Sequence, residues 1–122
     1  PYRGKWVYLD VWGTWCTPCK KQMEYVSAIK QAMKGKDVIF LYLANRSPEE
    51  SWKNVIKEYG LAGEQAVHYN LPTRLQDMLE KYLQVNSYPT YMLIDREGNI
   101  VDRKPPRPSA ENGLVDYLNE KL

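Results

Sequence analysis

Apolar runs and helical repeats alternate along this chain. Two apolar runs have the length and composition of buried strands: residues 6–11, interrupted by Asp10, and residues 38–43, which are continuous. Between and after them, apolar residues recur at helical spacing and predict helices. The expected core-facing positions are Met23, Val26, Ile29 and Met33; Trp52, Val55, Ile56 and Tyr59; Leu75, Met78, Leu79, Tyr82 and Leu83; and Leu114, Val115, Leu118 and Leu122.

Capping signals refine these boundaries. Residues 47–50, Ser-Pro-Glu-Glu, have the pattern of a capping box that starts a helix, and Thr73 with Gln76 repeats it. Gly60 is placed to end a helix in a left-handed conformation. The stretch between these two helices carries a weak signal, although residues 66–69 have the pattern of a short extra strand.

The composition fits one compact domain. The chain has 122 residues, of which 43% are apolar, enough to bury a modest single core. The net charge is only +2, and Lys and Arg are spread along the chain. The sequence therefore predicts neither a nucleic-acid-binding patch nor a membrane-binding stripe. It also contains no apolar segment of membrane-spanning length.

The two cysteines are the strongest chemical signal. Cys16 and Cys19 stand in Cys-x-x-Cys spacing directly after the first apolar run, where a strand ends and a helix begins. Unpaired backbone N–H groups and the positive end of the helix dipole favour a thiolate there, so we expect Cys16 to be the nucleophile. Cys19 is then the resolving thiol that displaces the substrate and closes the disulfide.

Two other interpretations of the cysteine pair remain open. A structural disulfide is one, but closing so small a ring would constrain little of the unfolded chain. Half of a zinc site is the other, but zinc usually needs four nitrogen or sulfur ligands, and the sequence adds only His68. We therefore expect no metal, and we predict no catalytic role for His68.

The sequence around the cysteines resembles the active-site segment of thioredoxin-fold proteins. Residues 10–20, Asp-Val-Trp-Gly-Thr-Trp-Cys-Thr-Pro-Cys-Lys, are especially similar to the membrane-anchored or periplasmic TlpA/ResA-type thiol-disulfide oxidoreductases. Residues 87–99 resemble that family's cis-proline loop, its next strand and the hairpin after it. The resemblance covers nearly the whole chain. It implies an α/β thioredoxin-like fold, with a central mixed β-sheet flanked by helices on both faces, and a redox-active Cys16–Cys19 disulfide without another cofactor.

The resemblance also implies a substrate-binding surface. It predicts a cis Tyr88-Pro89 bond that faces Cys16 and exposes backbone for pairing with an extended substrate. The residues alone favour an ordinary turn at this position. The other expected contact residues lie beside the cysteines: Trp15, Thr17 and Pro18.

Asp10 is the third candidate catalytic residue. By the period-two rule it shares a strand face with Tyr8 and Trp12, so burial should raise the pKa of its carboxyl. Such a group could take the proton of Cys19 as that thiol attacks the mixed disulfide, and its position matches the buried acid of thioredoxin. In the alternative interpretation, Asp10 only bonds a neighbouring backbone or lysine group at the strand end.

The chain departs from the family pattern at two places. The ResA-like branch carries an acidic residue after the second strand, where this chain has Ala-Asn-Arg-Ser at residues 44–47. Arg46 could favour the thiolate if it lay near the site. The segment from Pro105 to Pro108 stands where thioredoxins often place glycine. It either shapes the partner groove or spaces the last helix from the sheet.

We therefore expect one thioredoxin-like domain over residues 1–122 that reduces disulfides in protein substrates by dithiol exchange. The alternatives are a disulfide oxidant or isomerase, or a non-catalytic binding module of a longer protein. The sequence begins at Pro1 without an initiator Met or a secretory segment, so we expect a mature form or a domain excised from a longer precursor. The resemblance implies a bacterial periplasmic or extracytoplasmic setting and a membrane electron donor. We also expect a monomer.

Overall fold

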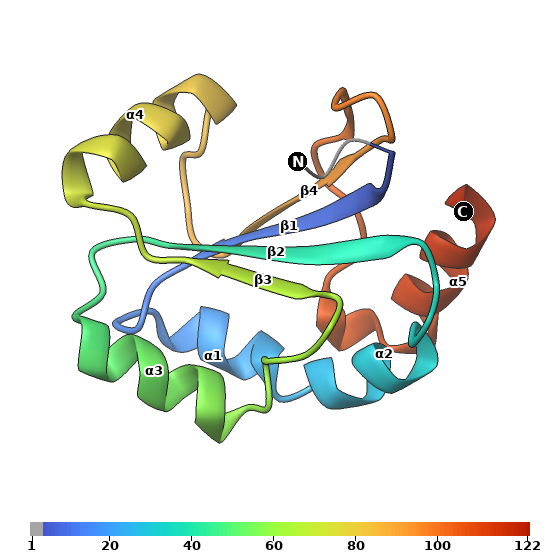
Figure 1. Cartoon of the computed structure of the whole chain (residues 1–122), viewed down its shortest axis with the longest axis horizontal. Helices are drawn as coiled ribbons and strands as arrows, with labels where there is room; N and C mark the ends of the chain where they lie inside the picture. Colours follow the sequence, from blue (N-terminus) through green and yellow to red (C-terminus); the bar gives the residue numbers. More distant parts are fainter. Residues whose placement is uncertain (1–3) are drawn as a thin grey trace.

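A computed structural model of the chain describes residues 4–122, in which five strands form one sheet. The strands span Trp6–Trp12 (β1), Val38–Ala44 (β2), Ala66–Tyr69 (β3), Thr90–Ile94 (β4) and Ile100–Asp102 (β5). Their order is β3-β2-β1-β4-β5 (Figure 1). β1, β2 and β3 are parallel, whereas β4 runs antiparallel to both β1 and β5.

Helices cover both faces of this sheet. They span Thr17–Met23 (α1), Val26–Ala32 (α2), Glu49–Glu58 (α3), Thr73–Leu83 (α4) and Asn112–Lys121 (α5), with a short 3-10 turn at Pro108–Ala110. Figure 1 shows α1, α2, α3 and α5 along one face and α4 on the opposite face. A mixed sheet between two helical layers agrees with the predicted fold class.

β1 divides the core into two layers because alternate residues of a strand point to opposite faces. Tyr8 and Trp12 join the larger apolar cluster, which includes side chains of α1, α2, α3 and α5. Leu9 and Val11 join the smaller cluster beneath α4. β1 is therefore covered on both faces, as its largely apolar sequence predicts.

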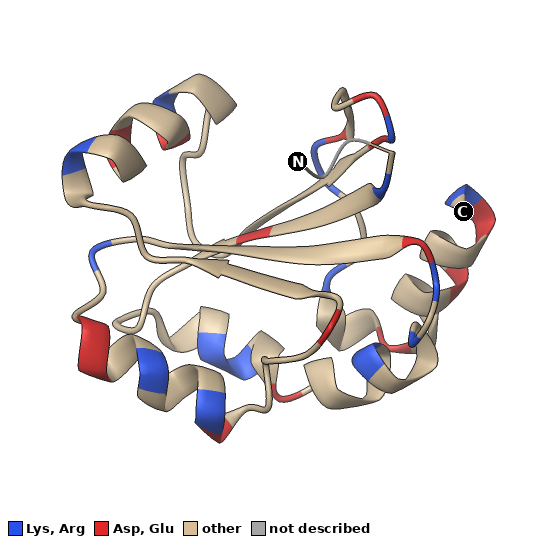
Figure 2. Ribbon diagram, in the orientation of Figure 1, with Lys and Arg blue, Asp and Glu red and all other residues tan. Residues whose placement is uncertain are grey.

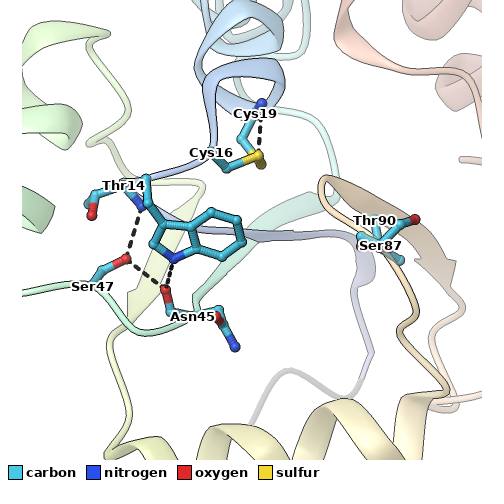
Figure 3. Close-up of a disulfide and its surroundings, with 8 residues drawn as sticks. Thr14, Cys16, Cys19, Asn45, Ser47, Ser87 and Thr90 are labelled. Carbon is cyan, nitrogen blue, oxygen red and sulfur yellow. Dashed lines mark hydrogen bonds between the residues drawn. A yellow bond between two sulfur atoms is a disulfide. The ribbon is translucent and has the colours of Figure 1, made fainter.

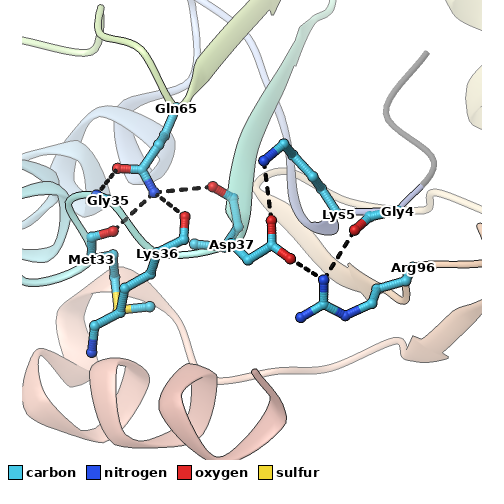
Figure 4. A network of polar contacts seen from close by, with 9 residues as sticks. Gly4, Lys5, Met33, Gly35, Lys36, Asp37, Gln65 and Arg96 are labelled. Carbon is cyan, nitrogen blue, oxygen red and sulfur yellow. Dashed lines mark hydrogen bonds and ion pairs between the residues drawn. The ribbon is translucent and has the colours of Figure 1, made fainter.

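A polar network holds the end of the sheet where β1 and β2 begin (Figure 4). Asp37 accepts hydrogen bonds from the side chains of Lys5 and Arg96. The side-chain amide of Gln65 donates to three backbone carbonyls at 2.9 to 3.2 Å, those of Met33, Lys36 and Val38. These bonds fix the connection between α2 and β2 at the end of the sheet away from the cysteines.

Several predicted elements agree with the structure. β3 occupies the residues that have the pattern of a short extra strand, and Gly60 follows α3 with a φ of 62°. The helical repeat from Met23 to Met33 is divided between α1 and α2, yet its four apolar residues are all buried. The spacing thus predicts the buried face correctly but not the break in the helix.

Both predicted capping boxes are wrong. α3 begins after Pro48 without a side-chain cap, and α4 begins at Thr73 itself, again without one. The Ser47 hydroxyl bonds elsewhere: it accepts from the backbone N–H of Thr14 at 3.0 Å and donates to the carbonyl of Asn45 at 2.9 Å. Ser47 therefore contributes to the loops around the cysteines and not to the start of α3.

The predicted core face of α4 is partly wrong. Leu83 is buried and Leu79 is half-buried, but Gln76 and Glu80 are buried beside them. Three predicted core residues are exposed: Leu75 (51%), Met78 (60%) and Tyr82 (80%). Gln76 Nε2 donates to the Glu80 carboxylate at 2.7 Å, one helical turn away. Gln76 and Glu80 thus occupy part of the inward face of α4, which the apolar spacing assigns to Leu75, Met78 and Tyr82.

Candidate active site

Cys16 and Cys19 form a disulfide at the start of α1, just beyond the end of β1 (Figure 3). Their Cα atoms are 5.3 Å apart. Cys16 is the N-cap residue of α1, with an extended backbone of φ −96° and ψ 100°, which confirms its predicted position. Pro18 lies in the first turn, where its missing N–H leaves no helical hydrogen bond unmade.

The start of α1 also supplies a donor to sulfur. The backbone N–H of Cys19 donates to Cys16 Sγ at 3.2 Å. After reduction, the same N–H would favour the thiolate of Cys16 over its thiol. Both cysteines are buried, with Cys16 4% exposed and Cys19 1% exposed.

Trp15 is 51% exposed directly before the disulfide. Its indole N–H donates to the backbone carbonyl of Asn45 at 2.9 Å, just after β2. Gly13 allows this arrangement, because a Cβ at that position would lie 2.4 Å from Trp15 Nε1. A side chain at residue 13 would therefore displace Trp15.

The Tyr88-Pro89 bond is cis, as the resemblance predicts. The Tyr88 ring packs edge-on against Trp15, with ring centres 5.1 Å apart. This contact joins the loop before β4 to the loop that carries the cysteines. Pro89 is buried and lines, together with Pro105 and Arg107, a surface pocket of about 170 Å³.

Asp10 is buried in the middle of β1. It lines a small internal cavity with Val26, Ile29 and Leu114, on the sheet face covered by α2 and α5. Its Oδ1 atom has no hydrogen-bond partner among residues 4–122. Burial raises the pKa of the Asp10 carboxyl to about 8, an effect partly opposed by the positive charge of Arg107. The unpartnered oxygen argues against the interpretation that Asp10 only bonds a backbone or lysine group.

Three polar residues around the site are absent from the predicted site residues: Asn45, Ser47 and Glu80. Ser47 links the backbones of Thr14 and Asn45 (Figure 3). The Asn45 side-chain amide then donates to Glu80 of α4 at 2.8 Å. The sequence signal for Asn45 is its position directly after a central strand, where site residues of such a sheet gather. Glu80 gives no such signal, since a glutamate in an amphipathic helix is expected on the solvent side.

Arg46 and His68 both bond groups other than the cysteines. Arg46 forms an exposed ion pair with Asp77 of α4 at 2.8 Å. His68 is half-buried, and its Nε2 bonds the carbonyl of Leu61 at 2.9 Å. Burial lowers the pKa of the His68 imidazole.

The segment from Pro105 to Pro108 lies beside the cis-proline loop. Both of these prolines are buried, and the carbonyl of Pro106 accepts a hydrogen bond from the Tyr8 hydroxyl at 2.7 Å. The segment borders the pocket at Pro89 and leads through the 3-10 turn into α5. Its two predicted roles both stay predictions, because the segment borders this pocket and also leads into the last helix.

The part of the chain that the structure describes holds no group of three or more His, Cys, Asp or Glu side chains suited to a metal ion. Figure 2 shows basic and acidic residues intermingled over helices and loops, as expected for a net charge of +2. Across residues 4–122, every helix is too short or too polar to cross a membrane.

Sequence comparison relates most of the chain to known proteins. Residues 4–100 match a family model described as thioredoxin-like. The thiol-disulfide oxidoreductase ResA of Bacillus thuringiensis (strain Al Hakam) is 34% identical over 118 residues, which cover 97% of this chain and 64% of that protein. ResA of Bacillus subtilis (strain 168) is 31% identical over 120 residues, 96% of this chain and 62% of that protein. The chain thus spans less than two thirds of the length of these relatives.

Solved structures agree with the fold. The thioredoxin domain of a thiol-disulfide oxidoreductase from Bacteroides vulgatus has a TM-score of 0.80 at 25% identity, over 98% of this chain and 80% of that one. A thiol:disulfide interchange protein from a Bacteroides species has a TM-score of 0.76 at 26% identity, over 98% of this chain and 74% of that one. These structures confirm the predicted thioredoxin-like fold, and the sequence relatives confirm the resemblance to ResA.

Replacing Asp10 with Asn should change how stability depends on pH. The folded-state pKa of about 8 lies above the value of about 4 for an unfolded aspartate, so unfolding releases a proton between these pH values. The free energy of unfolding of the wild type should therefore fall as pH rises from about 4 to about 8, relative to Asp10→Asn, by up to about 1.4 kcal/mol per pH unit. Urea unfolding at a series of pH values measures this difference.

Asp116→Asn, at an exposed position of α5, is the matched control and should follow the wild type. Parallel stability curves for the wild type and Asp10→Asn would contradict the raised pKa.

Proposed function

This chain belongs to the thioredoxin-like family, and from that membership we propose that it is a thiol-disulfide oxidoreductase that reduces disulfides in protein substrates. The observation that carries the proposal is the Cys16–Cys19 disulfide at the start of α1, directly after the central strand. The ResA relatives support the same chemistry. We extend the proposal to one domain over residues 1–122, of which residues 1–3 lie outside the described part.

The exchange needs only the two thiols. In the reduced enzyme, the Cys16 thiolate attacks one sulfur of a substrate disulfide, that S–S bond breaks, a mixed disulfide forms and one substrate thiolate leaves. Cys19 then loses its proton and attacks Cys16 Sγ, which releases the second substrate thiolate and closes the Cys16–Cys19 disulfide. Two electrons pass from the enzyme to the substrate, and an external dithiol must return them. The backbone N–H that faces Cys16 Sγ supports the role of Cys16 as nucleophile.

Asp10 is the proposed proton acceptor for Cys19. Its burial on the face of β1 that α2 and α5 cover and its pKa of about 8 support this role. A group whose pKa lies near the working pH is efficient in proton transfer, because both of its protonation states are populated. Asp10 would thus act in the resolving step, after Cys16 has attacked.

The proposed substrate surface surrounds the cysteines and consists of Trp15, Thr17, Pro18, Tyr88 and Pro89. Thr17, Pro18 and half of Trp15 are exposed beside the disulfide. The backbone at Tyr88 would pair with an extended segment of the substrate, as an added strand does. Backbone pairing depends little on side chains, so many protein disulfides would be accepted.

We place this activity in a bacterial periplasmic or other extracytoplasmic compartment, where it would contribute to thiol redox homeostasis. Protein disulfides persist in such compartments, which soluble thiols do not keep reduced. A membrane partner is therefore the proposed source of electrons. We further propose a monomer that uses its disulfide as the redox group, without a metal or a nucleic-acid partner.

Cysteine variants separate the two steps. Cys16→Ser should reduce insulin no faster than dithiothreitol alone, because the nucleophile is lost. Cys19→Ser should still attack and should accumulate a mixed disulfide with insulin, because nothing resolves it. Turbidity of reduced insulin and non-reducing gels measure the two effects, with Ser27→Ala on the exposed side of α2 as the control.

A wild-type protein that binds a partner but fails to reduce insulin would support the binding-module alternative. One that oxidises reduced proteins faster than it reduces disulfides would support the oxidant or isomerase alternative.

Asp10→Asn should slow resolution of the mixed disulfide near neutral pH and leave the first attack by Cys16 nearly intact. Only the ionised carboxylate can accept a proton, and its fraction rises with pH toward the pKa of about 8. The difference between the two proteins should therefore grow as pH rises from slightly acidic values to about 8. Acid quenching of the reaction, followed by separation of mixed disulfide from products, measures each step. Equal turnover at every pH would remove the proposed role.

A further inference from the structure

Glu80 is a buried carboxylate that pairs with no basic side chain among residues 4–122. It is 6% exposed on the inward face of α4. Burying a carboxylate is costly unless donors compensate for the lost water. Three side chains supply such donors: Asn45 Nδ2 donates to Oε2 at 2.8 Å, Gln76 Nε2 donates to Oε2 at 2.7 Å, and the Tyr88 hydroxyl donates to Oε1.

Two of these donors lead to the proposed substrate surface. The Asn45 backbone carbonyl accepts the indole N–H of Trp15 at 2.9 Å, and the Asn45 backbone N–H donates to the last residue of β1 at 2.7 Å. Tyr88 directly precedes the cis-proline, and its ring packs against Trp15. The contacts therefore close a ring that runs from Glu80 through Asn45, Trp15 and Tyr88 and back to Glu80.

An apolar residue at position 80 would be the simpler way to bury this face. Leu75 and Met78 of the same helix are more than half exposed, whereas Gln76 and Glu80 are buried. Well-packed apolar residues often replace buried polar groups without loss of stability. Packing of α4 against the sheet therefore does not by itself require this polar pair.

The geometry points to Glu80 as a positioning residue for protein-disulfide exchange, an inference that rests on the proposed function. Through Asn45 and Tyr88, its carboxylate keeps the packed pair of Trp15 and Tyr88 in place beside the disulfide. Glu80 does not touch the reacting sulfur atoms; it acts through Asn45 and Tyr88. A surface held in place before binding loses less conformational entropy when the substrate docks. The effect should therefore depend on substrate size.

Two substrates separate this role from a general effect on the cysteines. Insulin must dock on the surface around Trp15 and Tyr88, whereas hydroxyethyl disulfide is too small to span it. Glu80→Leu should lower kcat/KM for insulin about tenfold, mainly through KM, because the surface is no longer held. The rate with hydroxyethyl disulfide and the redox potential of the cysteine pair should stay unchanged.

Two conservative variants should lose less insulin activity than Glu80→Leu. Glu80→Gln keeps one acceptor oxygen and should retain part of the insulin activity. Tyr88→Phe keeps the ring contact with Trp15 and loses one hydrogen bond, so its loss should also be smaller than that of Glu80→Leu. Glu120→Gln, on the exposed side of α5, is the matched control and should behave as the wild type. Urea unfolding of each variant ensures that the folded proteins are compared.

Two kinetic results would overturn the inference. Unchanged insulin kinetics in Glu80→Leu would show that the carboxylate holds nothing that the substrate needs. An equal loss with both disulfides would show that Glu80 acts on the cysteines or on the whole fold. If the wild-type chain failed to reduce insulin at all, the proposed function would fall.

A readout without activity tests the holding contact itself. The indole N–H of Trp15 is assigned in the NMR spectrum by comparison with Trp15→Phe. In Glu80→Leu this proton should exchange faster with solvent, because the Asn45 side chain loses its bond to residue 80 and holds its backbone carbonyl less firmly. The indole N–H of Trp6 serves as an internal reference. Unchanged exchange at Trp15 would overturn the inference even if the proposed function is correct.

Discussion

The burial of β1 on both faces is the constraint on which the rest of the structure depends. β1 lies between β2 and β4 and contributes side chains to both apolar layers. Because the strand cannot slide or turn without exposing one of these layers, its end is fixed, and Cys16 follows it at a defined place. β1 and β2 are parallel, so their carboxyl ends meet at one edge of the sheet. This pairing brings Asn45 next to the cysteine loop.

The two buried carboxylates, Asp10 and Glu80, have different surroundings and therefore different proposed roles. Asp10 has an oxygen without a hydrogen-bond partner in the described residues, and burial raises its pKa to about 8. Glu80 accepts three side-chain hydrogen bonds, and two of them, from Asn45 and Tyr88, link it to the proposed substrate surface. The surroundings of Asp10 suit transfer of a proton, and those of Glu80 suit keeping neighbouring side chains in place. The residue type alone would not separate these roles.

Local patterns predict the centre of the site, and the structure adds contacts between distant segments. An apolar run followed by Cys-x-x-Cys is enough to place Cys16 at a helix start, and strand periodicity is enough to bury Asp10. The cis bond at Pro89 is predicted by the family resemblance, since the neighbouring residues favour an ordinary turn. Asn45 and Glu80 are 35 residues apart, and no local pattern reports a hydrogen bond over that separation. The same bond explains why the apolar spacing of α4 predicts its inward face only in part.

An equilibrium redox titration of Cys16 and Cys19 in dithiothreitol buffers, followed by tryptophan fluorescence, tests the central claim most directly. Trp15 directly precedes Cys16, so its emission should report the state of the pair. A reductase should show a reversible two-electron transition at a potential well below that of the glutathione couple. A much less negative potential would contradict the direction of electron flow. The absence of any reversible transition, by fluorescence and by thiol trapping, would contradict dithiol chemistry altogether.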